Sequence, residues 1–268
     1  MAHGQAPGLS REAIASGLRA LGLEAGSLVL VHSSLRSLGW VEGGAQTVID
    51  ALLEAVSPGG TVLVPTLTGT IPDGPEHPPV FDPRTTHCWT GTIPETFRRL
   101  PAARRSRHPT HSVAAIGPAT DWLIAGHENG ATPCAADSPY GRLAGAGGFI
   151  LLLGVTYDSN TSLHMVEELA GVPYHLQDKP APARVARADG AWEEIPTRLH
   201  LCRWERDFPR VEPLLLEAGG QRTGMVGKAR SRLIDARAMR DLLVPLLQRD
   251  PFFLLTDAAR AEYEQSSA

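Results

Sequence analysis

Cysteine is scarce in this sequence, and its spacing is irregular. The 268 residues include three cysteines, Cys88, Cys134 and Cys202, which are far apart and odd in number. This spacing excludes a disulfide framework and matches no zinc-binding pattern. We therefore expect free thiols, a reducing compartment and a cytoplasmic protein.

Long apolar runs and a dominant charge are also lacking. No stretch approaches the roughly 20 apolar residues that a membrane-spanning helix needs, and residues 1–5 lack the pattern of a signal peptide. The formal net charge is −4, whereas proteins that bind nucleic acid usually carry a basic surface. We therefore expect no membrane partner and no nucleic-acid partner.

What is present is an alternation of short apolar runs with amphipathic stretches. Buried strands are predicted at 27–31, 61–64, 113–116 and 149–155. Residues 45–56 repeat apolar side chains at helical spacing, and Ser10 is a suitable cap for a helix over 10–21. A further helix is predicted at 235–247, which Pro245 is expected to kink or end, and residues 262–268 are expected to fray. We predict an α/β fold in a single domain over residues 1–268, with its core at about 10–255 and a central mixed sheet flanked by helices.

Two segments interrupt this alternation. Residues 67–90 contain five prolines and no periodic pattern. A loop of this length in a compact domain is usually functional, so we expect it to cover a substrate. Residues 183–196 have Asp189-Gly190 at their centre, which predicts an inserted β-hairpin.

The stretch 158–168 carries the strongest chemical signal. It follows the apolar run at 149–155 and predicts a helix, for which Ser159, Asn160 or Thr161 is the expected cap. His164 and Glu167 stand three residues apart, so they share one face of that helix. A carboxylate beside an imidazole orients the ring and suits it to act as a general base. The alternative is a pair that meets only in solvent on an exposed helix face.

Polar clusters follow or precede the predicted strands at four places. They are His32-Ser33-Ser34, Thr66 with the long loop, His111-Ser112, and residues 158–167. In open α/β sheets the chemistry gathers beyond the carboxyl ends of the strands. We therefore expect some of these clusters to line one cleft.

The order and spacing of these motifs resemble the aminoglycoside 3-N-acetyltransferase family over about residues 10–255. The matching segments are 32–35 (HSSL), 60–66 (GTVLVPT), 81–83 (FDP), 91–98 (GTIPETFR), 105–112 (RSRHPTHS), 138–143 (SPYGRL), 153–155 (LGV), 160–167 (NTSLHMVE), 204–208 (WERDF), 227–229 (GKA) and 233–235 (LID).

The resemblance implies transfer of acetyl from acetyl-CoA to the 3-amino group of a 2-deoxystreptamine aminoglycoside. It implies an α/β domain unlike the common GCN5-related acetyltransferase fold, and no metal. His164 and Glu167 match the catalytic pair of the H-x-x-E motif. The segments at 32–34 and 106–112 match the coenzyme A side of the family. One departure is that Thr86 is followed by His87-Cys88-Trp89 where the family has a proline, so the accepted amines stay open.

These expectations assign roles to further residues, each with an alternative. The predicted coenzyme A contacts are His32, Ser33, Ser34, Ser106, His111 and Ser112, with Arg105 and Arg107 for the phosphates. The serines could instead cap turns, the histidines could be buried structural residues, and the arginines could form a solvated face. The predicted carboxylates for a polycationic acceptor are Asp82, Asp158, Glu168 and Asp207. Asp158 could instead cap the helix, and Asp207 could neutralise Arg203 or Arg206.

Three other classes of protein remain open. A metal hydrolase could use the H-x-x-E pair as two ligands, but the sequence provides no H-E-x-x-H motif and no third ligand by spacing. A covalent acyl-enzyme would need an activated nucleophile, and no G-x-S-x-G motif is present. The last is a binding protein that keeps the fold without turnover.

Overall fold

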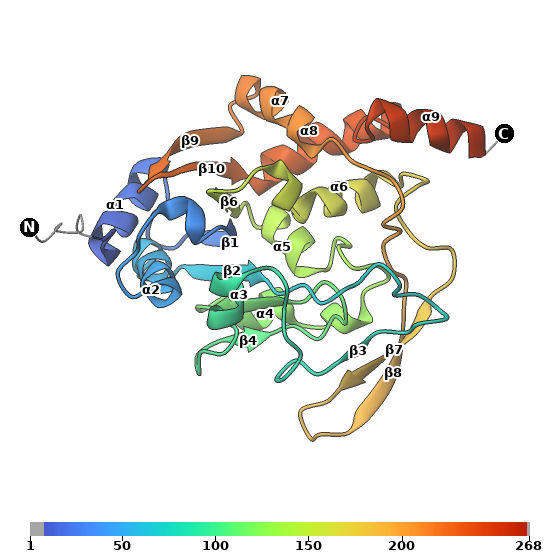
Figure 1. Ribbon diagram of the computed structural model, residues 1–268, viewed down its shortest axis with the longest axis horizontal. Helices are drawn as coiled ribbons and strands as arrows, with labels where there is room; N and C mark the ends of the chain where they lie inside the picture. Colours follow the sequence, from blue (N-terminus) through green and yellow to red (C-terminus); the bar gives the residue numbers. More distant parts are fainter. Residues whose placement is uncertain (1–7, 267–268) are drawn as a thin grey trace, which may run out of the picture.

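A seven-stranded mixed sheet forms the centre of the molecule, which we describe from a computed structural model for residues 8–266 (Figure 1). The strand order is β4 (Arg104–Arg105), β5 (Val113–Ile116), β2 (Thr61–Pro65), β1 (Leu28–Ser33), β6 (Phe149–Leu153), β10 (Ala229–Asp235) and β9 (Gln221–Val226). β1 runs parallel to β2 and to β6, and the other pairings are antiparallel. The predicted α/β class and mixed sheet are confirmed.

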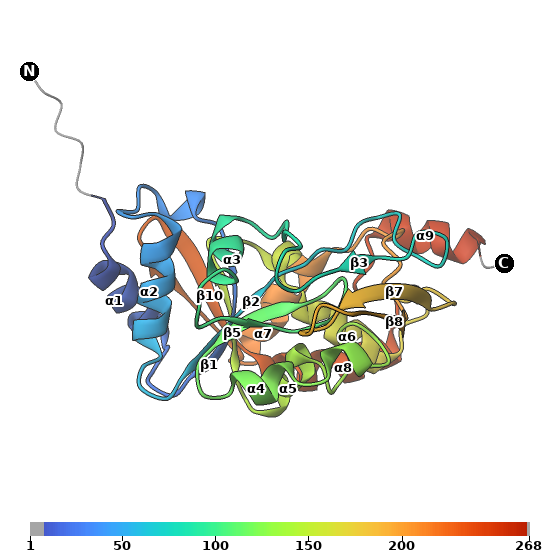
Figure 2. The same ribbon diagram turned by 90° about the horizontal axis from the view of Figure 1, so that it is seen from below.

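Helices cover both faces of this sheet (Figure 2). Within the described residues they are α1 (Arg11–Leu21), α2 (Ala45–Ala55), α3 (Thr92–Phe97), α4 (Thr120–Ile124), α5 (Pro139–Gly145), α6 (Ser162–Ala170), α7 (Glu212–Glu217), α8 (Ala236–Arg249) and α9 (Asp257–Ser266). Short 3-10 turns lie at Arg36–Leu38, His127–Asn129, Tyr157–Ser159 and Phe208–Val211. None of the helices between residues 8 and 266 has the length and apolarity to cross a bilayer.

Two apolar cores follow from the alternation of side chains along the strands. Val29 and Val31 of β1 pack with α1, α2 and α3, whereas Leu30 between them packs with α5, α6 and α8. The cap of α1 is as predicted, because the Ser10 hydroxyl accepts a hydrogen bond of 3.3 Å from the Ala13 N–H. Gly22, at φ 115°, ends this helix in a conformation that favours glycine.

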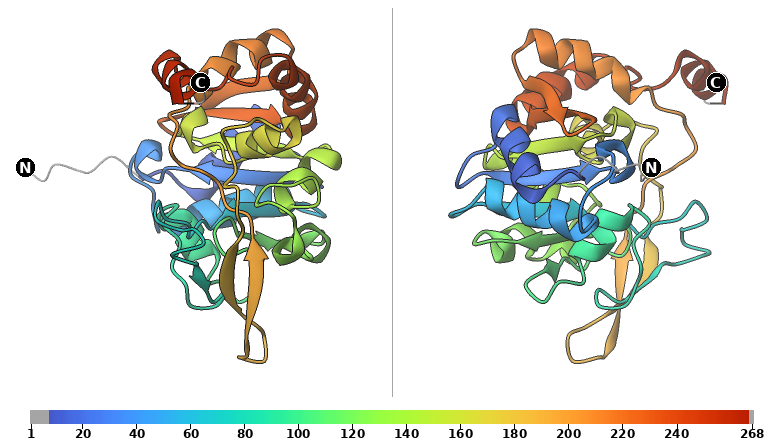
Figure 3. Two further views of the ribbon diagram at one scale, coloured as in Figure 1. Left: turned by 90° about the vertical axis from the view of Figure 1, so that its right-hand side faces the viewer. Right: turned by 60° about the vertical axis from the view of Figure 1, so that its left-hand side comes forward.

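A smaller three-stranded sheet combines the two segments that interrupt the alternation. β7 (Ala181–Ala186) and β8 (Trp192–Thr197) form an antiparallel hairpin where one was expected. β3 (Val80–Phe81), from the loop at 67–90, pairs in parallel with β7. The hairpin projects from the rest of the molecule (Figure 3). The long loop is therefore held at one edge of a second sheet.

The structure corrects several predictions near the C-terminus. Residues 221–235 form the hairpin β9–β10, although their polar sequence gave no strand signal. Residues 262–268 were expected to fray, but α9 continues to Ser266 because Tyr263 packs on Phe252 and Trp204, with ring centroids 5.1 and 5.2 Å apart. Residues 267–268, and the N-terminal residues for which no signal peptide was predicted, lie outside the described part. Pro245 was expected to kink or end a helix, yet α8 continues to Arg249.

Candidate active site

The candidate site begins where β6 leads into α6. The strand ends at Leu153, and Gly154 follows at φ 70°, where an added Cβ would lie 2.6 Å from Ser37. Of the three candidates, Thr161 occupies the cap position of α6 without a capping bond from its side chain, and the preceding Asn160 Oδ1 accepts a hydrogen bond of 3.2 Å from the Ser162 N–H. The first turn of α6 is thereby fixed against the end of the central sheet.

His164 and Glu167 are in contact on α6. His164 Nδ1 lies 2.7 Å from Glu167 Oε2, and the two side chains are 25% and 0% exposed. The alternative of a pair in open solvent is wrong, because the carboxylate is fully buried. With Nδ1 occupied by Glu167, Nε2 is the ring nitrogen that remains for chemistry.

Glu167 has two further cationic or polar partners. Arg206 Nε donates to its Oε1 at 3.2 Å, and His175 Nδ1 lies 3.2 Å from its Oε2. Burial alone would raise the pKa of Glu167, but His175, His164 and Arg206 together hold that pKa at about 2. The carboxylate is thus ionised at neutral pH. Arg206 therefore serves Glu167 and not Asp207, whose carboxylate accepts from Arg210 Nε at 3.1 Å.

His164 lies between two cavities. The loop-side cavity, of about 230 Å³, is lined by Leu67, Ile71, Asp73, Trp89, Thr110, His111, His164, His175, Leu199, His200, Leu201, Cys202 and Arg206, among others. The strand-side cavity, of about 340 Å³, is lined by Val31, His32, Ser33, Pro65, Leu67, Trp89, Gly91, Asp158, Asn160, Thr161 and His164, among others. Within residues 8–266, only His164, Leu67 and Trp89 line both cavities, so the two cavities share one ionisable side chain.

The predicted coenzyme A contacts of β1 lie partly at the strand-side cavity. His32 and Ser33 line it, and His32 Nε2 and Ser33 Oγ are buried without a hydrogen-bond partner among the described residues. Burial lowers the pKa of His32 to about 3, so its ring is neutral. The Ser34 hydroxyl instead accepts from the Ser37 N–H at 3.3 Å and bonds the Ser37 hydroxyl at 2.9 Å. Ser34 therefore closes the turn after the strand.

The serines of the segment 106–112 serve internal contacts. Ser106 Oγ accepts from the Val113 N–H and lies 2.9 Å from His127 Nδ1. Ser112 Oγ donates to the Thr66 carbonyl at 2.8 Å. Both residues are buried, and neither lines the two cavities at His164. The structure therefore does not place these serines where they were predicted to contact coenzyme A.

The two arginines predicted to bind phosphates are also occupied. Arg105 donates to the Thr66 carbonyl at 2.8 Å and to the Thr86 carbonyl at 2.6 Å, and it covers the ring of Phe81. Arg107 pairs with Glu128 at 2.9 Å and with Glu193 of β8. These guanidinium groups fasten the long loop and the hairpin to the central sheet.

The four predicted acceptor carboxylates are dispersed. Asp158 is exposed at the strand-side cavity and accepts from the Thr156 hydroxyl at 2.8 Å, so it does not cap α6. Asp82 pairs with Arg84 at 3.1 Å, and Asp207 pairs with Arg210. Glu168 is buried, accepts from the Cys134 N–H at 2.9 Å and lies 2.6 Å from His200 Nε2. All four carboxylates therefore already have partners within the protein, and of the four Asp158 alone lines a cavity at His164.

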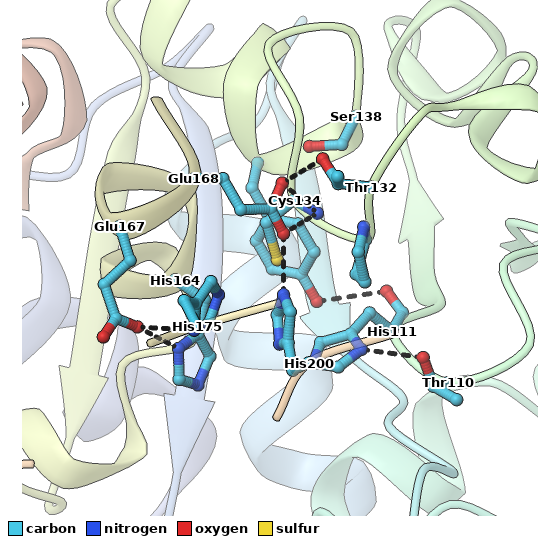
Figure 4. A network of polar contacts seen from close by, with 12 residues as sticks. Thr110, His111, Thr132, Cys134, Ser138, His164, Glu167, Glu168, His175 and His200 are labelled. Carbon is cyan, nitrogen blue, oxygen red and sulfur yellow. Dashed lines mark hydrogen bonds and ion pairs between the residues drawn. The ribbon is translucent and has the colours of Figure 1, made fainter. Parts of the chain in front are cut away.

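Sequence reasoning missed the histidines that surround His164 (Figure 4). The ring centroids of His175 and His200 lie 5.0 and 4.8 Å from that of His164. His111, predicted on the coenzyme A side, instead lines the loop-side cavity with its ring 4.2 Å from His200. His175 lies in the loop after α6 and His200 follows the hairpin β7–β8, and the two have no motif spacing. The nearest signal in the sequence was the count of ten histidines.

The architecture and this site can be compared with known proteins. A family model described as aminoglycoside 3-N-acetyltransferase matches residues 30–248. The chain belongs to the aminoglycoside 3-N-acetyltransferase family. It is 36% identical over 244 residues to aminoglycoside N(3)-acetyltransferase IV of Salmonella sp. The aligned part covers 88% of this chain and 86% of that protein.

Solved structures of the family share the fold. AAC(3)-IVa, solved as the apoenzyme, matches with a TM-score of 0.79 and 33% identity, over 97% of this chain and 99% of that one. A binary complex of AAC-IIIb with CoASH matches with a TM-score of 0.76 and 29% identity, over 90% and 97%. The resemblance predicted from the motifs is thus confirmed at the level of the family.

Proposed function

We propose that this chain transfers the acetyl group of acetyl-CoA to the 3-amino group of a 2-deoxystreptamine aminoglycoside by direct attack. The observation that carries the proposal is the position of His164, which lines two cavities while Glu167 holds its Nδ1. Two substrates that enter from opposite sides meet at this imidazole. Membership of the family supplies the reaction class.

In this reaction His164 is the general base. Most alkyl amines are ammonium ions at neutral pH and cannot attack until a proton is removed. The ammonium ion first loses one proton to solvent, and His164 Nε2 takes a second proton as the resulting amine nitrogen bonds to the thioester carbon. The C–S bond then breaks, and the thiolate leaves and takes the proton of the imidazolium, which returns His164 to its neutral form. Glu167, already ionised, fixes the imidazole tautomer and stabilises the imidazolium that forms.

Each cavity takes one substrate. The strand-side cavity receives acetyl-CoA, where the unpartnered Ser33 hydroxyl is available to donate to the carbonyl oxygen on which charge builds. The loop-side cavity receives the amine, and Asp73 is a carboxylate in its wall. Trp89, from the loop at 67–90, lines both cavities.

The remaining expectations belong to the same proposal. The chain acts as one cytoplasmic domain over 1–268, with the hairpin as an insertion in a fold distinct from the GCN5-related one. Transfer needs no metal ion, membrane or nucleic acid. The phosphates of coenzyme A are bound without Arg105 and Arg107, since both guanidinium groups have partners within the protein.

The test is the site of acetylation. An aminoglycoside with a free 3-amino group is incubated with acetyl-CoA and the protein, and the product is mapped by NMR. We expect one acetyl group, on the 3-amino nitrogen, and no product from a matched aminoglycoside whose 3-amino group is blocked. Acetylation of another nitrogen, or equal turnover of the blocked compound, would contradict the proposal.

A second candidate is N-acetylation of an amine with fewer charges. The loop-side cavity favours it, because Asp73 and Arg206 are the only acidic and cationic groups, apart from histidine, among the described residues that line it. A polycation needs more carboxylates than one. A competition between gentamicin and monoamines at equal concentration decides which acceptor is preferred.

A further inference from the structure

Three imidazoles of the loop-side cavity converge from separate parts of the chain. His164 lies on α6, His175 follows that helix, and His200 follows the hairpin β7–β8. Each offers a ring nitrogen, and the three nitrogens lie within 4.8 Å of one another. The loop-side cavity opens onto all three side chains.

Every one of these rings has one nitrogen engaged and one free. His164 Nδ1 is held by Glu167 and His200 Nε2 by Glu168, at 2.7 and 2.6 Å. His175 Nδ1 accepts from the Arg206 guanidinium at 3.0 Å and lies 3.2 Å from Glu167 Oε2, while its Nε2 is buried without a hydrogen-bond partner among the described residues. The nitrogens left over are thus His164 Nε2, His175 Nε2 and His200 Nδ1.

The carboxylates behind the rings complete an arrangement that metal sites use. A histidine that binds a metal usually donates its other ring N–H to a carboxylate, which fixes the ring and raises its basicity. Here Glu167 stands behind His164, Glu168 stands behind His200, and Nδ1 of His175 lies between Glu167 and the Arg206 guanidinium (Figure 4). Both glutamate side chains are buried. An ion bound by Nδ1 of His200 leaves the ring proton on Nε2, so binding releases the proton that Glu168 holds in the metal-free protein.

We propose that His164, His175 and His200 bind a transition-metal dication such as Zn²⁺, and that the bound ion inhibits acetyl transfer by occupying the Nε2 lone pair of His164. Three nitrogen ligands suit Zn²⁺ and its neighbours and not Mg²⁺ or Ca²⁺, which prefer oxygen. The cavity leaves a fourth position for water. The binding claim goes beyond the proposed function, whereas the inhibition claim rests on it.

The geometry requires a small closure. Bonds of about 2.0–2.1 Å in a tetrahedral zinc site place the nitrogens about 3.3 Å apart. The three residues offer ring nitrogens within 4.8 Å of one another, so the rings must turn or approach to bring all three onto one ion. His164 is the partly exposed member, at 25%, whereas His175 and His200 are 1% and 5% exposed. A competing set, His111, Cys134 and His200, shares His200. Its thiol is fully buried, and that burial raises the pKa of Cys134 well above its usual value, which disfavours the thiolate.

The direct test is binding of Co²⁺ and Zn²⁺ to the chelator-treated full chain. We expect one ion per chain and a tetrahedral Co²⁺ spectrum without a sulfur-to-metal charge-transfer band. His175→Gln and His200→Gln should each weaken binding at least tenfold, and Glu168→Gln by roughly 10- to 100-fold. The matched control is His77→Gln, which makes the same substitution at an exposed histidine and should bind like the wild type.

Other outcomes overturn the binding claim. Unchanged affinity in both His175→Gln and His200→Gln would do so, as would a sulfur band lost in Cys134→Ser. X-ray absorption of the Zn²⁺ complex of the wild type needs no variant, and it must report imidazole nitrogens and no sulfur. If the variants fail to fold, this measurement decides.

The inhibition claim has its own measurement. Zn²⁺ should suppress acetyl transfer by the wild type and by His77→Gln at the concentration that fills the site, and a chelator should restore it. Full turnover with the site occupied would refute inhibition. A chain that binds Zn²⁺ at these histidines but acetylates no amine under metal-free conditions would contradict the proposed function and leave the binding claim intact.

Discussion

Glu167 and Glu168 follow each other in α6, and both side chains are buried, with exposures of 0% and 3%. Their surroundings differ in charge. Glu167 faces Arg206, His164 and His175, which bring its pKa down to about 2 although burial opposes this. Glu168 faces the Cys134 N–H and the Thr132 hydroxyl, and burial raises its pKa to about 8 despite these hydrogen bonds. The first is a carboxylate at neutral pH, and the second holds its proton.

The difference shows that burial alone does not decide what a carboxyl group can do. His175, His164 and Arg206 together offset the loss of water for Glu167, whereas the hydrogen bonds from Thr132 and Cys134 do not offset it for Glu168. An ionised Glu167 stabilises an imidazolium at His164. A neutral Glu168 instead connects His200 to the segment at Thr132–Cys134. Of the two adjacent glutamates, Glu167 alone therefore carries the negative charge that the proposed role beside His164 requires.

The largest expected effect is the loss of kcat on substitution of His164, which lies beside Glu167 and not beside Glu168. His164→Ala should lower kcat by at least roughly a hundredfold, the low end for general-base catalysis, with little change in acetyl-CoA affinity. Steady-state kinetics and calorimetry measure the two quantities. Retention of most activity by a folded His164→Ala would remove His164 from the chemistry.

Glu167→Gln should destabilise the fold and lower kcat less than His164→Ala does. It leaves Arg206 without its buried charge partner, which typically costs about 3–5 kcal/mol of unfolding free energy. Folding lowers the pKa of Glu167 from 4.5 to about 2. The contribution of its ionised carboxylate to the free energy of unfolding is therefore present above pH 4.5 and is lost as pH falls towards 2. Denaturant unfolding between pH 2 and 7 should show the wild type and the variant converging at the acid end. A gap that stays constant with pH would contradict this.

Glu168→Gln should give the opposite pH dependence. Its folded pKa of about 8 lies above the ordinary value of 4.5, so the stabilisation is complete below pH 4.5 and is lost as pH rises through 8. The wild type should lose stability relative to Glu168→Gln across that window. Melting temperatures at pH 4, 6 and 8 suffice, and a parallel response of the two proteins would mean that Glu168 does not titrate there.

A smaller effect, on stability, is expected at Arg105. The sequence predicted that this residue binds a coenzyme A phosphate, whereas in the structure its guanidinium bonds Thr66 and Thr86. Arg105→Lys loses the bonds that the guanidinium makes to Thr66 and Thr86. Since hydrogen bonds that involve a charged group contribute about 1.5–3 kcal/mol each, we expect a stability loss of that order. Acetyl-CoA affinity should not change. A weaker affinity with unchanged stability would restore the predicted phosphate contact.

Local patterns in the sequence were enough for the core of the fold. The apolar runs at β1, β2, β5 and β6 and the helical spacing of α2 all appear as predicted, because burial on a sheet or a helix leaves a periodic signal. β9 and β10 show no such periodic signal. In β9, three consecutive polar residues and Gly224 precede the apolar residues, so its strand conformation depends on pairing with β10. Tertiary pairing is not encoded in a short window of sequence.

The site divides in the same way. His164 and Glu167 could be predicted because both lie within one turn of α6, so their spacing fixes their contact. Arg206 and His200 could not, because chain segments distant from α6 bring them there, and His175 could not, because the fold of the loop after α6 places it. The charges of Arg105 and Arg107 were visible in the sequence, but their partners were not. A motif therefore identifies the proposed catalytic pair, whereas the residues that surround the pair are found only from the structure.

The central claim is that His164 and Glu167 act as one unit, and a double-mutant cycle on kcat tests it most directly. His164→Ala, Glu167→Gln and the double variant are measured under identical conditions, with folding verified for each. Residues that work as a unit are not additive, so the double variant should be little slower than His164→Ala alone. Losses that multiply in the double variant would show two independent residues and would contradict the proposed mechanism.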